Sequence, residues 1–407
     1  MKLLVVASSI YDKGLFAKRR GITGLEIMLR DILDGVAGQI DCCMYATSLK
    51  NQGAQLGNIR LLPNNFTSFY RALNRVGIGR FKQLFNESNG RPLRERIKLT
   101  KATILLEQYV NEITPDIVNF HDLNDWNTFF VKRLENKGVK ILLTDHLYIG
   151  IKNRTCGYVK LRNNEEKIFK NAPANLYVSF VSTGMRERFL KDYPAFPLAK
   201  IFCVVNGTNV KMKDVSTLGK PAVFEKLKGK KVLLCIGGFN ARKNQHAIID
   251  AVGKMNHKEK NEVCVLFIGA GNKFKISRIL KTSKAPNSLF FIGTVPPSEM
   301  SSYYYYCDGT ITTSLNESFG LTIIEGFCYG KPAILFNDID SFKDLYDEKV
   351  CVPITEHSDK GIIKAINELT SKDWDYTYIR SYVNKFTTER VYKEYLEVYR
   401  KVNANAK

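Results

Sequence analysis

The sequence lacks several features that would set it apart from ordinary globular proteins. Its 407 residues contain no low-complexity tract and no internal repeat at a fixed period. No apolar run approaches the roughly 18–20 residues that a membrane-spanning helix needs. The apolar core of the first ten residues, MKLLVVASSI, is too short for a signal peptide and predicts a first buried strand instead. We therefore expect two globular domains of roughly 150–200 residues each.

Paired cysteine motifs are also missing. The chain has nine cysteines, but none of them forms a CxxC pair and most lie inside apolar segments. Structural metal sites and redox motifs depend on such close spacing, whereas small buried thiols are common in protein cores. We interpret the cysteines as reduced core residues of a cytoplasmic protein.

The chain has far fewer acidic than basic residues. The chain has 61 Lys and Arg residues against 40 Asp and Glu residues, which gives a net charge of +21. Residues 1–200 hold 31 basic and 18 acidic residues, so they carry +13 of this excess. The excess is densest between Arg60 and Lys101, where only Glu87 and Glu95 are acidic. The basic residues within this region include Arg71, Arg75, Arg80, Lys82, Arg91, Arg94, Arg96 and Lys98.

Two interpretations of this basic region stay open. Residues 60–112 predict helices on which aromatic residues alternate with arginines, and such a basic amphipathic surface can lie on an anionic membrane. The same pattern fits an aromatic stripe that faces the core beneath a solvated basic face. Nucleic acid is a weaker alternative, because the sequence has neither zinc-finger spacing nor an RNP motif.

Short apolar runs that end in glycine or polar residues alternate with helical patterns along the chain. The first run, residues 2–10, precedes a basic loop that ends at Gly24, and a later run ends at His121. In a doubly wound parallel sheet, such strand ends lie at the edge where ligands bind. The pattern predicts an α/β fold with a domain boundary near residues 206–230.

A second glycine-bearing loop follows the strand predicted at residues 231–236. It begins with Gly237 and Gly238 and contains the adjacent cations Arg242 and Lys243. Glycine lets backbone approach a ligand closely, and guanidinium or ammonium groups neutralise phosphate oxygens. The loop therefore suits a diphosphate, and a solvated Arg-Lys pair is the alternative.

The stretch from Thr313 to Pro332, TSLNESFGLTIIEGFCYGKP, has the most informative pattern. It carries Glu317 and Glu325 eight positions apart with Gly320 between them, and apolar residues follow at helical spacing. We expect a helix that starts near residues 316–318 and directs free N–H groups at a ligand. Because carboxylates beside an anion can bind only neutral donors such as hydroxyl groups, the stretch suggests a sugar-phosphate ligand.

These motifs, in this order, resemble those of the retaining GT-B glycosyltransferases of family 4, the glycosyl transferases group 1. Glu317 and Glu325 resemble the family's signature of two glutamates separated by seven residues. The resemblance covers almost the whole chain, and its further motifs are Gly24-Leu25-Glu26, Phe120-His121-Asp122, Asn206-Gly207, the loop from Gly237 to Asn244 and the terminal helix.

The resemblance implies the GT-B fold, with two Rossmann-like, doubly wound α/β domains facing across a cleft. Residues 1–205 would form the acceptor domain and residues 206–385 the nucleotide-sugar domain. Residues 386–407 would form a helix that crosses back to the first domain.

The resemblance also implies a role for each matching residue. Glu325 would bind the ribose hydroxyls and Glu317 the hydroxyls of the donor sugar, while Lys243 would stabilise the leaving nucleoside diphosphate in place of a metal. His121 would position a sugar hydroxyl or the reacting centre, so Glu317, Lys243 and His121 are the candidate catalytic residues. The other donor contacts would come from Arg242, Phe319, Gly320, Leu321, Thr322, Gly24 and Gly237.

The implied reaction is hexosyl transfer from a nucleoside-diphosphate sugar with retention of the anomeric configuration and without a metal or other cofactor. The acceptor would be a sugar or a lipid-linked precursor of a cell-surface polysaccharide, such as lipopolysaccharide or capsule. The enzyme would then be cytoplasmic, with peripheral contact to the inner face of the cell membrane.

One departure from the family pattern and three alternatives remain. Gly237-Gly238 stands where the family often has Gly-Arg, and we expect Arg242 to supply the missing charge. A GT-B nucleotide-sugar epimerase or phosphorylase is the first alternative, and a non-enzymatic nucleic-acid-binding protein is the second. The third is a metal site at Asp338-Ile339-Asp340, which has the Asp-x-Asp form but lies after the helix of the two glutamates.

Overall fold

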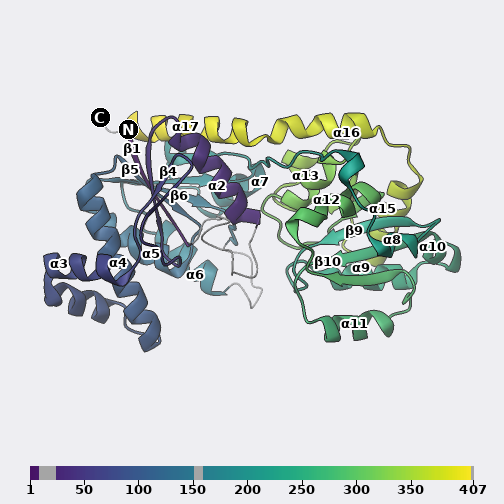
Figure 1. The fold of residues 1–407 in the computed structure, drawn as a ribbon, viewed down its shortest axis with the longest axis horizontal. Coiled ribbons are helices and arrows are strands. Elements are labelled where there is room, and N and C mark those ends of the chain that lie inside the picture. Colours follow the sequence, from purple (N-terminus) through teal and green to yellow (C-terminus); the bar gives the residue numbers. More distant parts are fainter. Residues whose placement is uncertain (9–23, 151–158, 405–407) are drawn as a thin grey trace. The chain divides into compact units, whose positions relative to one another are not determined.

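The computed structural model describes residues 1–8, 24–150 and 159–404 (Figure 1). Contacts divide the chain into two compact units. Unit 1 consists of Met1–Val181, Met185–Asn206 and Thr388–Lys407, and unit 2 of Ser182–Gly184 and Gly207–Thr387. Each unit is built around one sheet whose strands are buried on both faces, so their sequences are continuously apolar.

Unit 1 contains an eight-stranded sheet in the order β3-β4-β2-β1-β5-β6-β7-β8, as far as the described residues show. All neighbouring strands are parallel except β3 and β4. The strands are β1 (Lys2–Ala7), β2 (Asp41–Ala46), β3 (Ala54–Leu56), β4 (Ile59–Leu61), β5 (Ile117–His121), β6 (Lys140–Asp145), β7 (Leu176–Phe180) and β8 (Ile201–Cys203). Strand order reverses between β1 and β5, which marks the topological switch point.

Helices cover this sheet. They are α2 (Gly24–Ala37), α3 (Phe66–Glu87), α4 (Leu93–Ile113), α5 (Asp125–Leu134), α6 (Val159–Phe169), α7 (Thr183–Asp192) and α17 (Thr388–Ala404). The terminal helix α17 packs beside α2 within unit 1 (Figure 1), where the Tyr392 ring lies against Gly35. Helices α3 and α4 pair along the predicted helical region 60–112, and α3 is kinked at Gly77, whose φ of 79° is not helical.

Unit 2 contains a parallel sheet whose described strands run in the order β11-β10-β9-β12-β13-β14. They are β9 (Lys231–Ile236), β10 (Val263–Ile268), β11 (Leu289–Gly293), β12 (Gly309–Ile311), β13 (Ala333–Phe336) and β14 (Cys351–Ile354). The switch point lies between β9 and β12. The helices are α8 (Ala222–Glu225), α9 (Gln245–Lys254), α10 (His257–Glu262), α11 (Lys273–Lys281), α12 (Pro297–Tyr306), α13 (Leu321–Cys328), α14 (Phe342–Leu345), α15 (Asp359–Ser371) and α16 (Tyr376–Tyr382).

The cysteines of the described chain are free thiols, and all but Cys203 are buried. Cys156 lies outside the described residues. None of the helices in the described ranges is both long and apolar enough to cross a membrane.

Candidate active site

Two loops of unit 2 meet because their strands are neighbours. The loop after β9 carries Lys243, the loop after β12 carries Glu317, and both strands end at the switch point of the sheet. The Leu315 amide donates to the Arg242 carbonyl at 2.9 Å, and the Thr313 hydroxyl donates to the Asn244 carbonyl at 2.8 Å. These bonds fix the two loops to each other, so residues 74 positions apart in sequence share one site.

Glycines allow this edge of the sheet to pack closely. Gly237 has a φ of 144°, and a Cβ there would lie 3.2 Å from the Lys243 side chain. A Cβ on Gly269, which follows β10, would lie 2.2 Å from the Gly237 carbonyl oxygen. Any larger residue at Gly269 would force the two loops apart. The sequence predicted the glycine loop at Gly237 but gave no sign of its contact with Gly269.

Lys243 and Glu317 form an ion pair between the Lys243 Nζ and a Glu317 carboxylate oxygen. Only 15% of the Lys243 side chain and 12% of the Glu317 side chain are exposed, so water screens the pair weakly. The two candidate catalytic residues therefore contact each other directly, although the family resemblance implies a separate ligand for each.

Arg242 also contacts the loop that carries Glu317. Its guanidinium donates to the Asn316 carbonyl oxygen at 3.3 Å. The side chain of Asn316 is only 6% exposed, yet neither its amide nitrogen nor its amide oxygen has a hydrogen-bond partner among the described residues. A buried, unpaired amide next to Glu317 costs free energy unless a ligand pairs with it. Asn316 is thus a candidate ligand contact that the sequence analysis did not identify.

Helix α13 starts later than predicted. We expected the helix to begin near residues 316–318, but its first residue is Leu321 and its N-cap is Gly320, with a φ of 83°. Only glycine takes this left-handed conformation without strain, so the chain turns there and cannot continue as a helix from Glu317. The first backbone bonds of the helix run from Ile323 and Ile324 to Gly320, which leaves the Leu321 and Thr322 amides at the open end.

The neighbouring Phe319 is 3% exposed and packs against the Phe386 ring, with 5.9 Å between the ring centroids. Its side chain is therefore a core residue. Any ligand contact from Phe319 must come from its backbone amide.

Glu325 lies on the second turn of α13 and is held by Tyr304 of α12. The Tyr304 hydroxyl lies 2.7 Å from Glu325 Oε2 and 3.2 Å from the Thr322 carbonyl oxygen. Burial raises the pKa of the Glu325 carboxyl, and the hydrogen bond from Tyr304 opposes that rise. Burial and the nearby Glu325 carboxylate hold the pKa of Tyr304 well above its ordinary value, so this hydroxyl remains a donor.

In unit 1, His121 ends β5 inside a buried polar network. Its Nε2 lies 3.2 Å from the Asn119 amide nitrogen, and its Nδ1 lies 2.9 Å from His146 Nε2. The Asn119 amide also donates to the Tyr399 hydroxyl of α17 at 2.8 Å. Because Asn119 can only donate through this nitrogen, His121 Nε2 accepts and His121 Nδ1–H donates to His146.

The last N–H group of this hydrogen-bonded network belongs to His146. Its Nδ1 is buried and has no hydrogen-bond partner in the part of the chain that the structure describes. Burial lowers the pKa of His146 to about 4, and burial together with His146 lowers that of His121. Both rings are thus neutral near pH 7. His121 uses both of its nitrogens within unit 1, and His146 presents the free N–H.

Gly24 is the first residue of α2 and not part of the preceding loop. Residues 9–23, where the sequence predicts the glycine-bearing loop, lie outside the described residues. The predicted contact between Gly24 and the donor stays a prediction.

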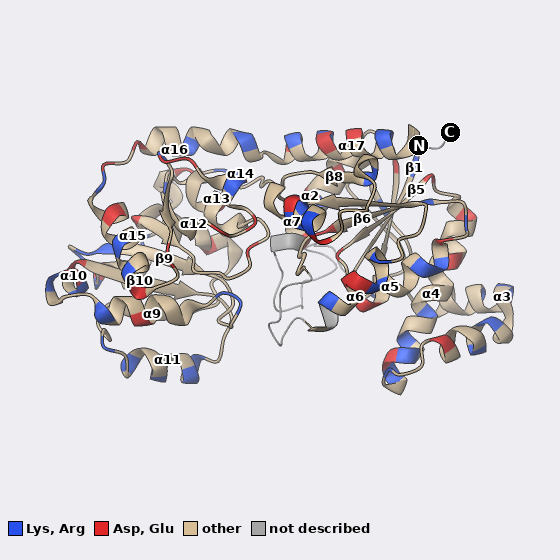
Figure 2. Cartoon of the chain, turned by 180° about the vertical axis from the view of Figure 1, so that it is seen from behind, with Lys and Arg blue, Asp and Glu red and all other residues tan. Residues whose placement is uncertain are grey.

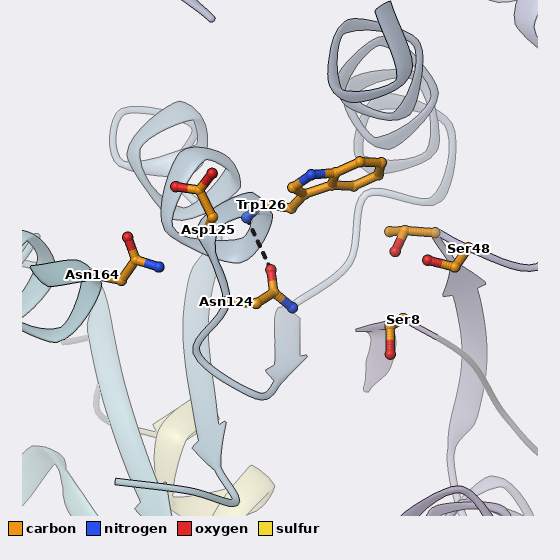
Figure 3. Close-up of a pocket in the computed structure, with 7 residues that line it drawn as sticks. Ser8, Ser48, Asn124, Asp125, Trp126 and Asn164 are labelled. Atoms are coloured by element: carbon orange, nitrogen blue, oxygen red, sulfur yellow. Dashed lines mark hydrogen bonds between the residues drawn. The ribbon is translucent and has the colours of Figure 1, made fainter. Parts of the chain in front are cut away.

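A cavity of about 340 Å³ opens at the switch point of unit 1 (Figure 3). Its lining comes from the segments that follow β1, β2 and β5 and from α6, namely Ser8, Thr47, Ser48, Asn124, Asp125, Trp126 and Asn164. Asn124 caps α5 by accepting from the Trp126 amide at 2.9 Å, and Asp125 pairs with Arg91 at 2.9 Å. The buried Asn164 amide nitrogen has no partner among the described residues, so the cavity contains an unused donor.

The Asp-x-Asp segment does not gather ligands for a metal. Asp338 is 62% exposed and lies 2.9 Å from His357. Within the described ranges, no group of three or more His, Cys, Asp or Glu side chains is arranged to hold a metal ion.

Comparison with known proteins identifies the family of unit 2. Residues 220–386 match the family model described as "Glycosyl transferases group 1". Unit 2 is a group 1 glycosyl transferase domain. This match confirms the predicted family, and it includes Lys243, Glu317, Glu325 and the α13 start.

Two curated relatives align with parts of the chain. An O-antigen chain mannosyltransferase C from Escherichia coli is 23% identical over 180 residues, which is 42% of this chain and 47% of the relative. An alpha-monoglucosyldiacylglycerol synthase from Streptococcus pneumoniae (strain ATCC BAA-255 / R6) is 30% identical over 107 residues, which is 26% of this chain and 24% of the relative. The alignments thus span less than half of either relative.

Solved structures confirm the predicted fold class. A sucrose-phosphate synthase from Thermosynechococcus elongatus is 16% identical and has a TM-score of 0.70, with both chains covered completely. The group 1 glycosyl transferase domain and unit 1 are therefore the two Rossmann-like α/β domains of a GT-B fold.

Three candidate site residues were not predicted from the sequence. Tyr304 and Asn316 lie near the group 1 signature, and His146 contacts the strand-end histidine His121. Tyr304 lies in a run of four tyrosines, from which no pattern selects the one that reaches Glu325. Asn316 directly precedes Glu317, so its position was a usable signal. His146 follows β6 as His121 ends β5, and this shared strand-end position could have identified it.

Proposed function

We propose that this protein is a retaining glycosyltransferase that moves a sugar from a nucleoside-diphosphate sugar to an acceptor. The observation that carries the proposal is the buried ion pair of Lys243 and Glu317 beside the open amino end of α13. A cation and free backbone amides suit a diphosphate, and a carboxylate beside them suits sugar hydroxyls.

Each polar group then has a defined ligand. Glu325, held by Tyr304, accepts hydrogen bonds from the ribose hydroxyls. The Leu321 and Thr322 amides donate to the diphosphate. A diphosphate also competes with Glu317 for Lys243, so donor binding frees Glu317 to accept hydroxyls of the donor sugar. Arg242 orients the Asn316–Glu317 loop through the Asn316 carbonyl and has further guanidinium donors for phosphate oxygens.

Stabilisation of the leaving group is what accelerates the proposed transfer. As the glycosidic bond breaks, negative charge grows on the departing diphosphate, and Lys243 with the α13 amides stabilises it without a metal. The sugar passes through a short-lived oxocarbenium-like ion pair, and the acceptor hydroxyl attacks from the face that the diphosphate leaves and gives its proton to the departing diphosphate. This route retains the anomeric configuration and needs no carboxylate nucleophile. The His146 N–H, oriented by His121, is a donor for a sugar hydroxyl.

The cavity at the switch point of unit 1 is our candidate for the acceptor. Trp126 offers an aromatic face on which a sugar ring can stack, and the hydroxyls of Ser8 and Ser48 and the Asn164 amide can bond to its hydroxyls (Figure 3). The acceptor is a sugar or a lipid-linked sugar. The Streptococcus pneumoniae relative is named for making a glucosylated diacylglycerol, and the Escherichia coli relative for work on an O-antigen chain.

We further propose peripheral contact between the α3–α4 pair and an anionic membrane on the cytoplasmic side. Several arginines of this region already have partners, because Arg75, Arg80 and Arg91 pair with Glu112, Glu107 and Asp125. The ribbons of α3 and α4 carry both blue and red segments in Figure 2. The exposed residues that remain are the cations Arg71, Lys82, Arg94 and Lys98 and the apolar Phe66, Tyr70, Ile78 and Leu93. Sedimentation with phosphatidylglycerol vesicles but not with phosphatidylcholine vesicles is the expected result.

Product analysis tests the reaction. The protein is incubated with a nucleoside-diphosphate sugar of known anomeric configuration and candidate acceptors, and the product linkage is read by NMR. We expect the configuration of the donor to be retained and activity to persist in excess chelator. Inversion, or loss of activity in chelator, contradicts the mechanism. Conversion of the donor sugar without an acceptor indicates an epimerase, and dependence on inorganic phosphate indicates a phosphorylase.

A further inference from the structure

Unit 1 has a second cavity at the opposite end of its sheet. The cavity, of about 460 Å³, opens where β1 and β2 begin, at Lys2 and Asp41, and extends between α3 and α4. The candidate acceptor cavity instead lies where these strands end. Because each strand has six residues at about 3.3 Å per residue, roughly 17 Å separate the two ends. The two cavities are therefore different sites.

Positive charge dominates this second cavity. Four cations, Lys2, Arg60, Arg71 and Arg75, line it together with the carboxylates of Asp41 and Glu112. Arg75 pairs with Glu112, and Arg60 donates to the Cys43 thiol sulfur at 2.7 and 3.1 Å. Arg71 is exposed, one helical turn before Arg75, and no described residue forms an ion pair or hydrogen bond with its guanidinium. It is the cation that an anionic ligand can engage without breaking an existing contact.

Gln108 of α4 contributes an unused acceptor to the same cavity. Its amide nitrogen donates to Glu112 Oε1 at 2.9 Å, which fixes the orientation of the amide. Its amide oxygen is buried and has no hydrogen-bond partner among the residues that the structure describes. A buried acceptor without a donor costs free energy, and a ligand hydroxyl would satisfy it.

We propose that this cavity binds a phosphate ester that also carries free hydroxyl groups, such as a glycerol phosphate or a sugar phosphate. Arg71 binds the phosphate, with Arg60 beside it, and the Gln108 amide oxygen accepts from a ligand hydroxyl. A neutral sugar leaves Arg71 without an anion, and an ester without hydroxyls leaves Gln108 unpaired. The site is separate from the donor and acceptor sites and depends on no step of the transfer reaction.

Calorimetric titration of the full chain with glycerol 1-phosphate and glucose 1-phosphate tests the proposal. Arg71→Ala should weaken binding by about tenfold or more, because it removes a charged hydrogen-bond donor. Gln108→Leu should weaken binding of both esters as well. The control is Lys132→Ala, which removes an exposed cation of α5 in unit 1 that belongs neither to the cavity nor to the proposed membrane surface, and it should leave binding of both esters unchanged. Lys243→Ala should also leave binding intact, which separates this site from the donor site.

Vesicles distinguish the two sources of such a ligand. If the source is a lipid headgroup, phosphatidylglycerol vesicles should sediment the wild type and Lys132→Ala but much less of Arg71→Ala, while phosphatidylcholine vesicles sediment none. If the source is a soluble ester, titration should depend on Arg71 while sedimentation does not. Equal binding by the wild type, Arg71→Ala and Gln108→Leu overturns the proposal, as does a loss in Lys132→Ala equal to that in Arg71→Ala. Unchanged thermal unfolding of each variant excludes misfolding as the cause.

Discussion

Tyr304 affects both the protonation and the orientation of the Glu325 carboxyl. Burial raises the pKa of the Glu325 carboxyl, and a protonated carboxyl can no longer accept through both oxygens. The hydrogen bond from Tyr304, at 2.7 Å, opposes this rise and fixes the carboxylate on α13. One tyrosine therefore controls both the charge and the orientation of the proposed ribose contact.

Replacing Tyr304 with Phe should weaken donor binding. The change removes a hydrogen bond worth roughly 0.5–1.5 kcal/mol, so we expect a dissociation constant about two- to tenfold higher. It also raises the pKa of Glu325 further, so the defect should grow as the pH falls and shrink as the pH rises. Calorimetry with the donor at pH 6 and pH 8 measures both effects. A defect of equal size at both pH values would show that the Tyr304 hydroxyl does not control the charge of Glu325.

The histidine pair should titrate far below the ordinary range. Because burial lowers the pKa of His146 to about 4, its ring should stay neutral at pH 5 in nitrogen-detected NMR spectra. In the unfolded chain His146 takes up a proton near pH 6.5, whereas the buried ring of the folded protein stays neutral at that pH. Stability of unit 1 should therefore fall as the pH drops from 6.5 toward 4, by up to about 3 kcal/mol from this group.

In His146→Gln the acid-induced loss of stability should be smaller than in the wild type. Titration of His146 near pH 6.5 would contradict the buried neutral network.

At the scale of elements, one glycine determines where α13 begins. Gly320 has a φ of 83°, and a Cβ there would lie 3.0 Å from Ile323 Cδ1. The left-handed residue ends the loop that carries Glu317 and directs the Leu321 and Thr322 amides outward. A helix that started at residues 316–318 would have carried Glu317 on its first turn and lost this loop.

Gly320→Ala should destabilise unit 2. The left-handed conformation costs a residue with a Cβ about 1–2 kcal/mol, and the contact with Ile323 adds to that cost. We expect a lower denaturation midpoint for unit 2 and weaker donor binding. Gly79→Ala is the matched control, because no atom lies within 4 Å of a Cβ at that position of α3. Equal stability of Gly320→Ala and the wild type would refute the role of this turn.

The sequence predicted the elements better than their boundaries. Apolar runs bounded by polar residues identified the strands that end at His121 and Ile236, because burial on both faces requires continuous apolar sequence. The start of α13 was wrong because polar residues such as Asn316 and Ser318 are typical N-caps, and only the backbone conformation of Gly320 decided otherwise. The ion pair of Lys243 and Glu317 depends on the neighbouring positions of β9 and β12, which spacing along the chain does not specify.

At the scale of the molecule, both units place polar groups at their topological switch points. In unit 2 the switch lies between β9 and β12 and carries the candidate donor site. In unit 1 it lies between β1 and β5 and carries the Trp126 cavity. The family signature made the first site predictable, whereas the second is assembled from single residues after several strands, which no local pattern marks.

The excess basic residues do not form one uniformly positive surface. Many basic residues between Arg60 and Lys101 have carboxylate, thiol or aromatic partners, so a count of charges overstates what remains free. The segment around α11 is different, because Lys273, Lys275, Arg278 and Lys281 lie in a stretch without acidic residues. The ribbon of α11 carries blue segments in Figure 2. A charge of +21 therefore predicts anionic partners in general but not the surface that binds them.

Donor binding tests the central claim most directly. A panel of nucleoside-diphosphate sugars is screened by thermal shift, and the best ligand is titrated into the wild type, Glu325→Ala and Lys243→Ala. We expect one donor, at 100 times its dissociation constant, to stabilise the wild type by about 2.7 kcal/mol. Both variants should bind it at least tenfold more weakly, while Glu317→Ala should mainly lower turnover. Failure of every nucleotide sugar to bind, or equal binding by Glu325→Ala and the wild type, would contradict the assignment of this protein as a nucleotide-sugar glycosyltransferase.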